Sequence, residues 1–154
     1  MTYVDEHLLP GEIVAFRTTL HWKIYVLPAV MGVFLLALVA AALMSPHQLL
    51  AVLPAILLVV VIAVPYLRRR FAEFAVTNKR VLVKLGVTHT RSVELLLNKV
   101  EGITVNQGLG GKLFGYGEIV ITGTGGTPEV FSDIQSPFEF RRAVQVATDA
   151  RDAR

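Results

Sequence analysis

Two long uncharged stretches dominate the hydropathy pattern of the chain. From Ile24 to Met44, and again from Leu49 to Leu67, no residue carries a formal charge and nearly all are apolar. Each run is long enough to cross the hydrocarbon core of a bilayer, which takes about 20 helical residues. A short polar break, Ser45 to Gln48, separates them. The pattern predicts a transmembrane helical hairpin over residues 24–67, with spans at 24–44 and 49–67.

Two other classes of segment give similar hydropathy. A signal peptide has a shorter apolar core, lies closer to the N-terminus and is followed by a small-residue cleavage site, none of which fits the first run. A buried helical hairpin of a soluble protein needs a large surrounding shell, which a chain of 154 residues is too short to supply. We therefore favour the membrane hairpin.

The distribution of basic residues predicts the orientation of this hairpin. Arg17 and Lys23 precede the first span, Arg68, Arg69 and Arg70 follow the second, and the loop between the spans holds no Lys or Arg. Short cytoplasmic flanks carry an excess of Lys and Arg. We expect a multi-pass protein of the inner (plasma) membrane with both termini in the cytoplasm.

Outside the predicted spans, apolar and polar residues alternate with a period of two. Short alternating segments with turn residues between them are typical of antiparallel sheets. We expect seven strands, forming an open barrel or sandwich, around residues 13–20, 74–76, 81–85, 93–97, 103–105, 119–121 and 129–131. The first of them precedes the hairpin, so the hairpin is predicted to be an insertion between the first and second strands.

The C-terminal segment has helical periodicity. Ser136, Pro137 and Glu139 match a capping box with proline at the first helical position. Apolar residues then recur on one face, at Phe140, Ala143, Val144 and Ala147. The predicted organisation is residues 1–23 with the first strand, the hairpin at 24–67, and residues 71–150 as the rest of a mostly β, α+β domain capped by one helix.

Several segments together resemble one known family. They are Gly11–Trp22, Glu73–Gly86, Val93–Gln107, Gly110–Gly126 and Ser136–Val144. They resemble the bacterial pleckstrin-homology (PH)-like domain family of small two-span membrane proteins. The resemblance implies seven antiparallel strands closed by a C-terminal helix, and it carries over no catalytic residue. The loop that binds inositol phosphates in other PH domains is here replaced by the hairpin, so no such site is carried over.

Composition and motifs exclude several chemistries. Only 18% of residues are charged and there is no cysteine, which excludes disulfides, thiolate metal sites and a cysteine nucleophile. The histidines His7, His21, His47 and His89 lack metal-ligand spacing. The glycine-rich run before Lys112 fails the P-loop pattern because Leu113 replaces the required Ser or Thr. We expect no catalytic residue, metal, cofactor or small-molecule substrate, and therefore no enzyme.

The remaining candidates are interaction surfaces. Arg68, Arg69 and Arg70 are predicted to contact lipid headgroups, and Lys79, Arg80 and Lys84 either extend that basic patch or form a solvated strand face. The predicted interaction loops contain Gln107, Gly110, Gly111, Lys112, Tyr116, Gly125 and Gly126. Basic residues without interleaved aromatics argue against nucleic acid.

We therefore expect a membrane-anchored, non-enzymatic interaction or scaffold module that contacts the lipid bilayer and binds a protein partner or forms a homo-oligomer. The alternatives are an anionic-lipid sensor and, less favoured, an unrecognised enzyme.

Overall fold

The computed structural model describes residues 3–86 and 90–152, so His89 lies outside the described residues. The chain divides into two compact units. Residues Trp22–Arg70 form one, which we call the helical hairpin. Met1–His21 and Phe71–Arg154 form the other, which we call the β domain. The β domain is thus assembled from two pieces of chain that flank the hairpin in sequence.

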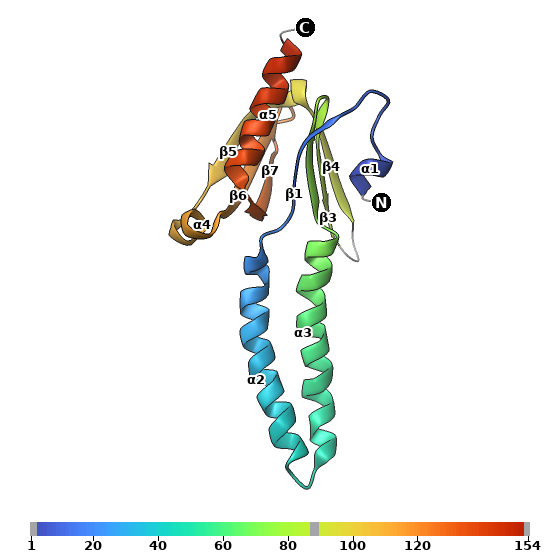
Figure 1. Cartoon of the computed structure of the whole chain (residues 1–154), viewed down its shortest axis with the longest axis vertical. Helices are drawn as coiled ribbons and strands as arrows, with labels where there is room; N and C mark the ends of the chain where they lie inside the picture. The colour runs from blue at the N-terminus through green and yellow to red at the C-terminus, as the bar shows by residue number, and fades with distance from the viewer. Residues whose placement is uncertain (1–2, 87–89, 153–154) are drawn as a thin grey trace. The chain divides into compact units, whose positions relative to one another are not determined.

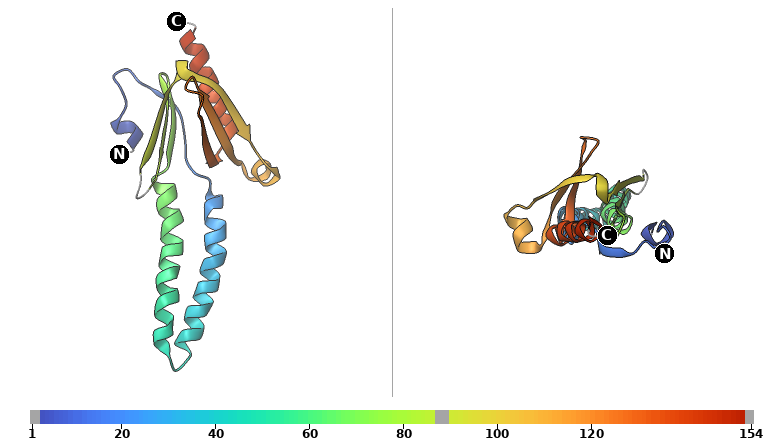
Figure 2. Two further views of the ribbon diagram at one scale, coloured as in Figure 1. Left: turned by 180° about the vertical axis from the view of Figure 1, so that it is seen from behind. Right: turned by 90° about the horizontal axis from the view of Figure 1, so that it is seen from above.

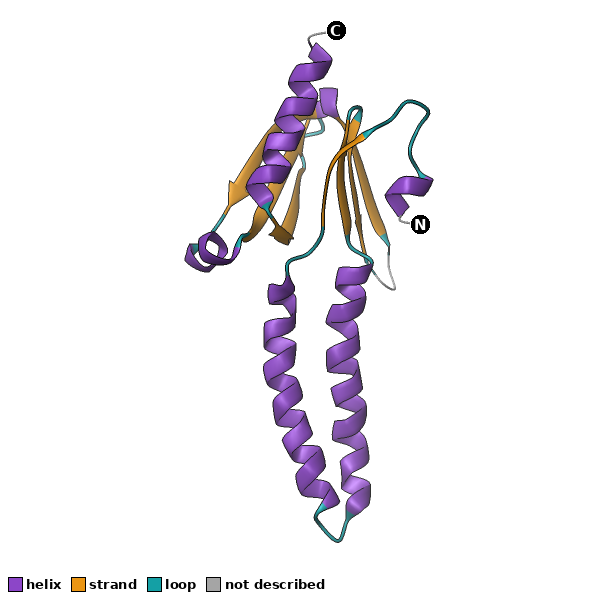
Figure 3. Cartoon of the chain, in the orientation of Figure 1, coloured by secondary structure: helices purple, strands orange, loops and turns teal. Residues whose placement is uncertain are grey.

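The hairpin consists of two long helices, each preceded by a 3-10 turn (Figure 3). The elements are η1 (Trp22–Tyr25), α2 (Val26–Leu43), η2 (Gln48–Ala51) and α3 (Val52–Arg70). Both helices are long and apolar enough to cross a membrane, with a mean hydropathy of 2.6 and 2.8. Helix α3 continues through Arg70, beyond the predicted end at Leu67. Arginine is a good helix former, and cations are favoured near the C-terminus of a helix, which explains the extension.

The first sheet of the β domain is antiparallel, in the order β1-β2-β3-β4 (Figure 1). Its strands are β1 (Val14–Thr18), β2 (Glu73–Thr77), β3 (Arg80–Leu85) and β4 (Arg91–Leu96). Strands β1 and β2 lie on either side of the hairpin in sequence yet pair directly, with Thr18 opposite Phe74. The hairpin is therefore an insertion within this sheet.

The second sheet is also antiparallel, in the order β5-β6-β7. Its strands are β5 (Val100–Asn106), β6 (Tyr116–Gly123) and β7 (Pro128–Gln135), and the short elements η3 (Leu97–Lys99) and α4 (Leu109–Phe114) precede β5 and β6. The C-terminal helix α5 (Pro137–Asp152) contacts β1 and β2 of the first sheet and β5 and β6 of the second (Figure 2). The prediction of an antiparallel, mostly β domain with one C-terminal helix is confirmed.

Backbone hydrogen bonds join the two sheets where the chain after β1 meets β7. The chain after β1 bridges to β7 at Leu20 and Ile134, and the Gln135 N–H donates to the Thr19 carbonyl at 3.0 Å. Within the described ranges, 3–86 and 90–152, β4 and β5 do not pair with each other. The domain is therefore an open sandwich and not a closed barrel.

Aromatic residues from both sheets and from α5 form the core between the layers. Phe74 of β2 meets Phe131 of β7 edge-on, with ring centroids 5.8 Å apart, and Phe16 of β1 meets Phe140 of α5 in the same way at 6.4 Å. Phe74, Phe131 and Phe140 are buried, as are the β6 residues Ile119 and Ile121. Burial of this apolar surface is the main force that holds α5 on the sheets.

The N-terminal segment covers the outer face of the first sheet. A one-turn helix, α1 (Tyr3–Glu6), places Val4 on Ala75 and Leu82, with Leu8 and Val14 packed around them. The Glu73 carboxylate accepts hydrogen bonds from the N–H groups of Tyr3 and Val4. This cover explains why β2 and β3 bury residues on both faces.

The start of α5 differs from the predicted capping box. Pro137 is the first helical residue, as predicted. However, Ser136 has a left-handed φ of 51°, and its N–H donates to the Gly115 carbonyl at 2.9 Å instead of to the Glu139 carboxylate. The turn before the helix is therefore tied to the end of α4.

Candidate functional surface

The first glycine-rich loop folds into a short helix that the sequence analysis did not predict. Gln107 donates from Nε2 to the carbonyls of Gly111 and Tyr116, each at 2.9 Å. Gly111 is buried, and a Cβ there would lie 2.4 Å from the Tyr116 carbonyl oxygen. A Cβ on Gly110 would lie 2.8 Å from the Tyr116 hydroxyl oxygen. These glycines let α4 approach β6 closely, so their first role is packing.

The outward face of α4 is apolar. Leu109 is 87% exposed, Leu113 is 78% exposed and Phe114 is 53% exposed, and the exposed Lys112 lies among them. Gly111 occupies the inward face of the same helix. This arrangement inverts the usual pattern of a surface helix, in which the apolar face is the buried one.

The second predicted loop lies at the other end of β6. Gly125 and Gly126 form the exposed turn between β6 and β7, where Gly126 has a φ of +75°. Helix α4 precedes β6, and β6 has eight residues, so the two loops are separated by about 25 Å of strand. The predicted interaction residues therefore do not form one continuous surface.

The predicted headgroup contacts Arg68, Arg69 and Arg70 form the last turn of α3. Arg68 and Arg70 are exposed. The Arg69 guanidinium carbon lies 5.8 Å from the centre of the Tyr25 ring, a cation–π geometry within the hairpin. Arg68 and Arg70 are thus exposed, whereas Arg69 contacts Tyr25 and links the end of α3 to the residue before α2.

A groove in the β domain runs between β5 and α5. It has a volume of about 430 Å³, and five consecutive strand residues, Val100 to Thr104, form one wall. The other wall is one side of α5, formed by Arg141, Val144, Gln145, Thr148 and Asp149. Strand β5 pairs with β6 only, so the edge that borders the groove has no partner strand among the described residues.

The walls of the groove combine apolar and charged residues. Val144 is buried and Ile103 half-buried, whereas Glu101 and Asp149 are exposed. In the part of the chain that the structure describes, none of the charged groups of Arg141, Glu101 and Asp149 forms an ion pair. Sequence analysis missed this groove because β5 reads as an ordinary alternating strand, and its position at a sheet edge follows only from the topology.

The hairpin has a hollow of its own between α2 and α3. Its volume is about 800 Å³, and its walls include Pro28, Gly32, Leu58 and Pro65 with Tyr25 and Tyr66 at one end. The lining is almost entirely apolar. It offers van der Waals contact and very little polar recognition chemistry.

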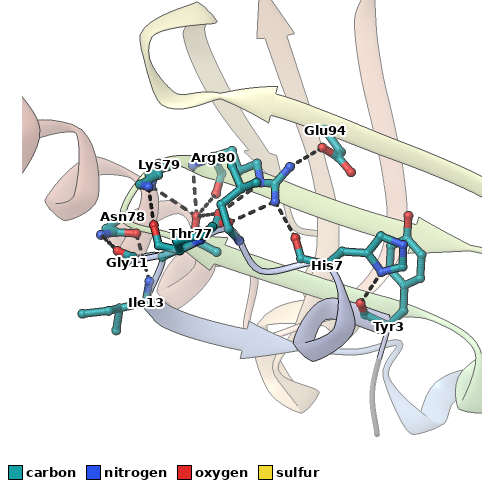
Figure 4. Close-up of polar contacts among 12 residues, drawn as sticks. Tyr3, His7, Gly11, Ile13, Thr77, Asn78, Lys79, Arg80 and Glu94 are labelled. Atoms are coloured by element: carbon teal, nitrogen blue, oxygen red, sulfur yellow. Dashed lines mark hydrogen bonds and ion pairs between the residues drawn. The ribbon is translucent and has the colours of Figure 1, made fainter.

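The densest polar cluster joins the N-terminal segment to the turn between β2 and β3 (Figure 4). Arg80 donates from Nε and Nη2 to the two carboxylate oxygens of Glu12, each at 3.0 Å, and both residues are buried. Its Nη2 also donates to the His7 carbonyl at 2.7 Å, and Nη1 donates to Glu94. Thr77 Oγ1 lies 2.7 Å from the Glu12 carboxylate.

This cluster perturbs the ionisation of its members. Burial alone would raise the pKa of Glu12, but hydrogen bonds from Arg80, the Leu9 N–H and the Thr77 hydroxyl, with the charge of Arg80, outweigh it and lower the pKa. The hydrogen bond to Glu12 likewise raises the pKa of Arg80. Glu12 and Arg80 are both charged at neutral pH and hold each other in place.

The three basic residues of this region do not form a free headgroup patch. Arg80 is buried against Glu12, and the Lys79 ammonium donates to the Pro10 carbonyl at 3.0 Å. The Lys84 ammonium lies 4.2 Å from the centre of the Tyr3 ring. For Arg80 both interpretations from the sequence were wrong, because the N-terminal segment that covers it was not predicted to fold there. Lys79 is exposed and Lys84 is half-buried.

Two carboxylates and one histidine have structural partners. Glu118 bonds Asn106 and Ser132, and Glu129 pairs with Arg91. His21 is buried, with its ring 5.1 Å from the Tyr116 ring. Across residues 3–86 and 90–152, no three His, Asp or Glu side chains are grouped to hold a metal ion.

Comparison with protein families identifies the fold that carries these surfaces. The family model described as "Bacterial PH domain" matches residues 23–148. The chain belongs to the bacterial PH domain family. No curated protein and no solved structure matches the chain.

The matched range and the folded PH domain do not coincide. The match begins at residue 23, after β1, and it includes all of the hairpin except Trp22. Yet β1 pairs with β2 along the first sheet, and Leu20 bridges to Ile134. The residues before the hairpin are therefore part of the PH domain in three dimensions. A PH domain is generally a non-catalytic interaction module, so the surfaces described above are candidates for binding rather than catalysis.

Proposed function

We propose that this protein is a membrane-anchored PH domain that binds an extended segment of a protein partner in the groove between β5 and α5. One observation carries the proposal: the unpaired edge of an antiparallel sheet borders a groove whose opposite wall is a helix face. An extended peptide can add to such an edge as a further strand, with main-chain hydrogen bonds for affinity and side-chain pockets for specificity.

The chemistry of the groove fits a peptide better than a small molecule. The contact wall is a stretch of backbone from Val100 to Thr104, which offers repeated main-chain donors and acceptors. Val144 and Ile103 provide an apolar contact for one side chain of the partner. Arg141 supplies a cation for an acidic side chain or a terminal carboxylate.

The membrane anchor rests on the exposure of the hairpin. Only 6% of the most apolar stretch of the first helix and 11% of that of the second helix are buried. A soluble monomer rarely exposes continuous apolar surface on this scale. Arg68, Arg69 and Arg70 follow the second span, and by the positive-inside rule they support a location at the inner (plasma) membrane with both termini in the cytoplasm.

Site-specific photo-crosslinking in cells tests the partner site. A benzophenone amino acid replaces Thr104 on β5 or Gln145 on α5, which face the groove. Glu139, exposed on the first turn of α5 but outside the groove, is the matched control position. Thr124 probes the alternative contact surface around Gly125 and Gly126.

The proposal predicts one protein adduct that appears from Thr104 and Gln145 and is absent from Glu139. An added T104K substitution, which places a charge at the strand edge, should abolish the adduct from Gln145. An adduct at twice the mass of the chain identifies a homo-oligomer as the partner. An adduct from Thr124 alone would move the site to the β6–β7 turn, and lipid adducts alone would refute partner binding.

The arginines at the end of α3 favour a second candidate function, the sensing of anionic lipid. Arg68 and Arg70 are exposed and are held on the last turn of a helix, and each basic residue at a membrane surface adds about 1 kcal/mol of attraction to anionic headgroups. The test compares native protein with R68Q/R70Q in vesicles of pure phosphatidylcholine or with added phosphatidylglycerol. Sensing requires that phosphatidylglycerol alters hydrogen exchange in the native protein, that the variant shows no such change, and that salt suppresses it.

A further inference from the structure

Helix α4 presents an apolar surface that the β domain leaves uncovered. In the β domain, the two most exposed large apolar side chains among the described residues are Leu109 and Leu113. They are four positions apart, so they lie on the same face of the helix. Phe114 and the cationic Lys112 border them.

Several contacts hold the helix with this face outward. Gly111 packs on the Tyr116 carbonyl. The Gln107 side chain donates hydrogen bonds to the carbonyls of Gly111 and Tyr116. The Gly115 N–H donates to the Gly111 carbonyl at 2.8 Å. The leucines are therefore displayed by the packing of the glycines, and they do not fold back onto the sheet.

Contacts within the β domain place α4 at the end from which the chain leaves for the hairpin. Tyr116, two residues after α4, has its ring 5.1 Å from the ring of His21. The His21 N–H donates to the Asp133 carbonyl at 2.7 Å. The apolar helical segment starts at the next residue, Trp22. The returning chain re-enters at the same end, because Thr19 Oγ1 donates to the Ala72 carbonyl at 3.1 Å.

We propose that Leu109, Leu113 and Phe114 of α4 insert into the interfacial layer of the bilayer that the hairpin spans. The inference rests on the proposed membrane anchoring, and it assigns a second, peripheral membrane contact to the β domain. The apolar helical segment begins at the residue after His21, so this end of the domain is covalently tethered to the proposed span. Leu and Phe side chains bury favourably at the headgroup–acyl boundary, and Lys112 extends its ammonium to the headgroups.

The lipid occupant is favoured by the length and composition of α4. A helix of six residues offers too little area for a stable protein interface, which needs about 800 Å² on each partner. Insertion of a few apolar side chains, in contrast, needs no complementary surface. It orients the PH domain and so presents the β5–α5 groove in a fixed direction.

Depth-dependent fluorescence quenching on the full chain tests this inference. The chain has no cysteine, so single cysteines at Leu113, Leu109, Val33 and Thr127 each carry one NBD probe in phosphatidylcholine vesicles. Val33 is an exposed residue of α2 and reports on the span, whereas Thr127 is exposed in the β6–β7 turn. All four positions are exposed, so the label does not disturb the core.

The inference predicts that probes at Leu113 and Leu109 have blue-shifted emission and are quenched by doxyl-labelled lipid, as at Val33, while aqueous iodide quenches only Thr127. If Val33 is in lipid but iodide quenches Leu113 and Leu109 as readily as Thr127, the inference fails and the anchor stands. If Leu113 is shielded from both quenchers, a protein covers α4 and the inference also fails. Iodide quenching at Val33 would refute the membrane anchor itself.

Discussion

Arg80 donates hydrogen bonds to both carboxylate oxygens of Glu12, although the whole hairpin lies between the two residues in sequence. The pair is buried, and the same guanidinium holds the His7 carbonyl at 2.7 Å. Residues 3–12 are thereby fixed to the turn between β2 and β3. The pair therefore joins the two pieces of chain that build the PH domain.

Removal of Glu12 should loosen this junction. In E12A the buried Arg80 loses its main counter-charge, which costs about 3 kcal/mol of folding free energy. Hydrogen exchange of the full chain in detergent should show about 100-fold lower protection in β1–β3 peptides. The matched control is E94A, because the side chain of Glu94 is 41% exposed and its pair with Arg80 is worth less than about 1 kcal/mol. Equal losses in the two variants would contradict the role of burial.

The same pair should make the domain sensitive to acid. The folded state lowers the pKa of Glu12 below its ordinary value of 4.5, so its contribution to stability is present above pH 4.5 and is lost as the pH falls through the lowered value. A titration of the unfolding free energy from pH 7 to pH 3 should therefore fall less steeply in E12Q than in the native chain. Parallel curves would show that the carboxylate of Glu12 is not coupled to folding.

The sequence predicted most helices and strands well, but it did not predict the buried Glu12–Arg80 pair. Alternation along β1–β7 and the uncharged spans were visible because each is set by local periodicity. The buried state of Arg80 depends on a partner far away in sequence, and basic residues on a strand are usually solvated. One signal was available: Phe74–Val76 and Val81–Val83 are continuous apolar runs, which are typical of strands covered on both faces.

Helix α4 shows a second limit of sequence reasoning. The segment contains Gly110 and Gly111, which are unfavourable in helices, so local propensity predicts a loop. Tertiary packing overrides that propensity, because only a residue without a Cβ fits against the Tyr116 carbonyl.

This packing predicts different responses from two glycines. In G111A the new Cβ must enter the space of the Tyr116 carbonyl and Gln107 Cγ, and overpacking of this kind costs about 1–3 kcal/mol. In G125A the new Cβ meets nothing within 4 Å, so the change should stay within about 0.5 kcal/mol. Hydrogen exchange of peptides over residues 107–116 measures both. Matching protection in G111A and the native chain would mean that α4 is not packed through Gly111.

Because α1 covers the first sheet, substitutions at a buried and an exposed residue of the N-terminal segment should differ in their effect on stability. Val4 is 2% exposed and packs on Ala75 and Leu82, so V4A should cost about 2 kcal/mol through lost burial and the cavity left behind. Ile13, which is 70% exposed, provides the control in I13A, for which little change is expected. Chemical unfolding of the full chain in detergent compares the two. A neutral V4A would show that the N-terminal segment does not stabilise the sheet.

Strand pairing constrains how the chain can thread a bilayer. Thr18 lies opposite Phe74 in one sheet, so the residues before and after the hairpin must be on the same side, and the spans must cross twice or not at all. Single cysteines at Glu6, Thr127 and His47, all exposed, test this in intact cells with a membrane-impermeant maleimide. We expect labelling at His47 alone, and labelling at all three sites after detergent treatment, which controls for reactivity. Labelling of Thr127 but not Glu6 in intact cells would contradict the shared sheet, because no fold can hold β1 against β2 with a bilayer between them.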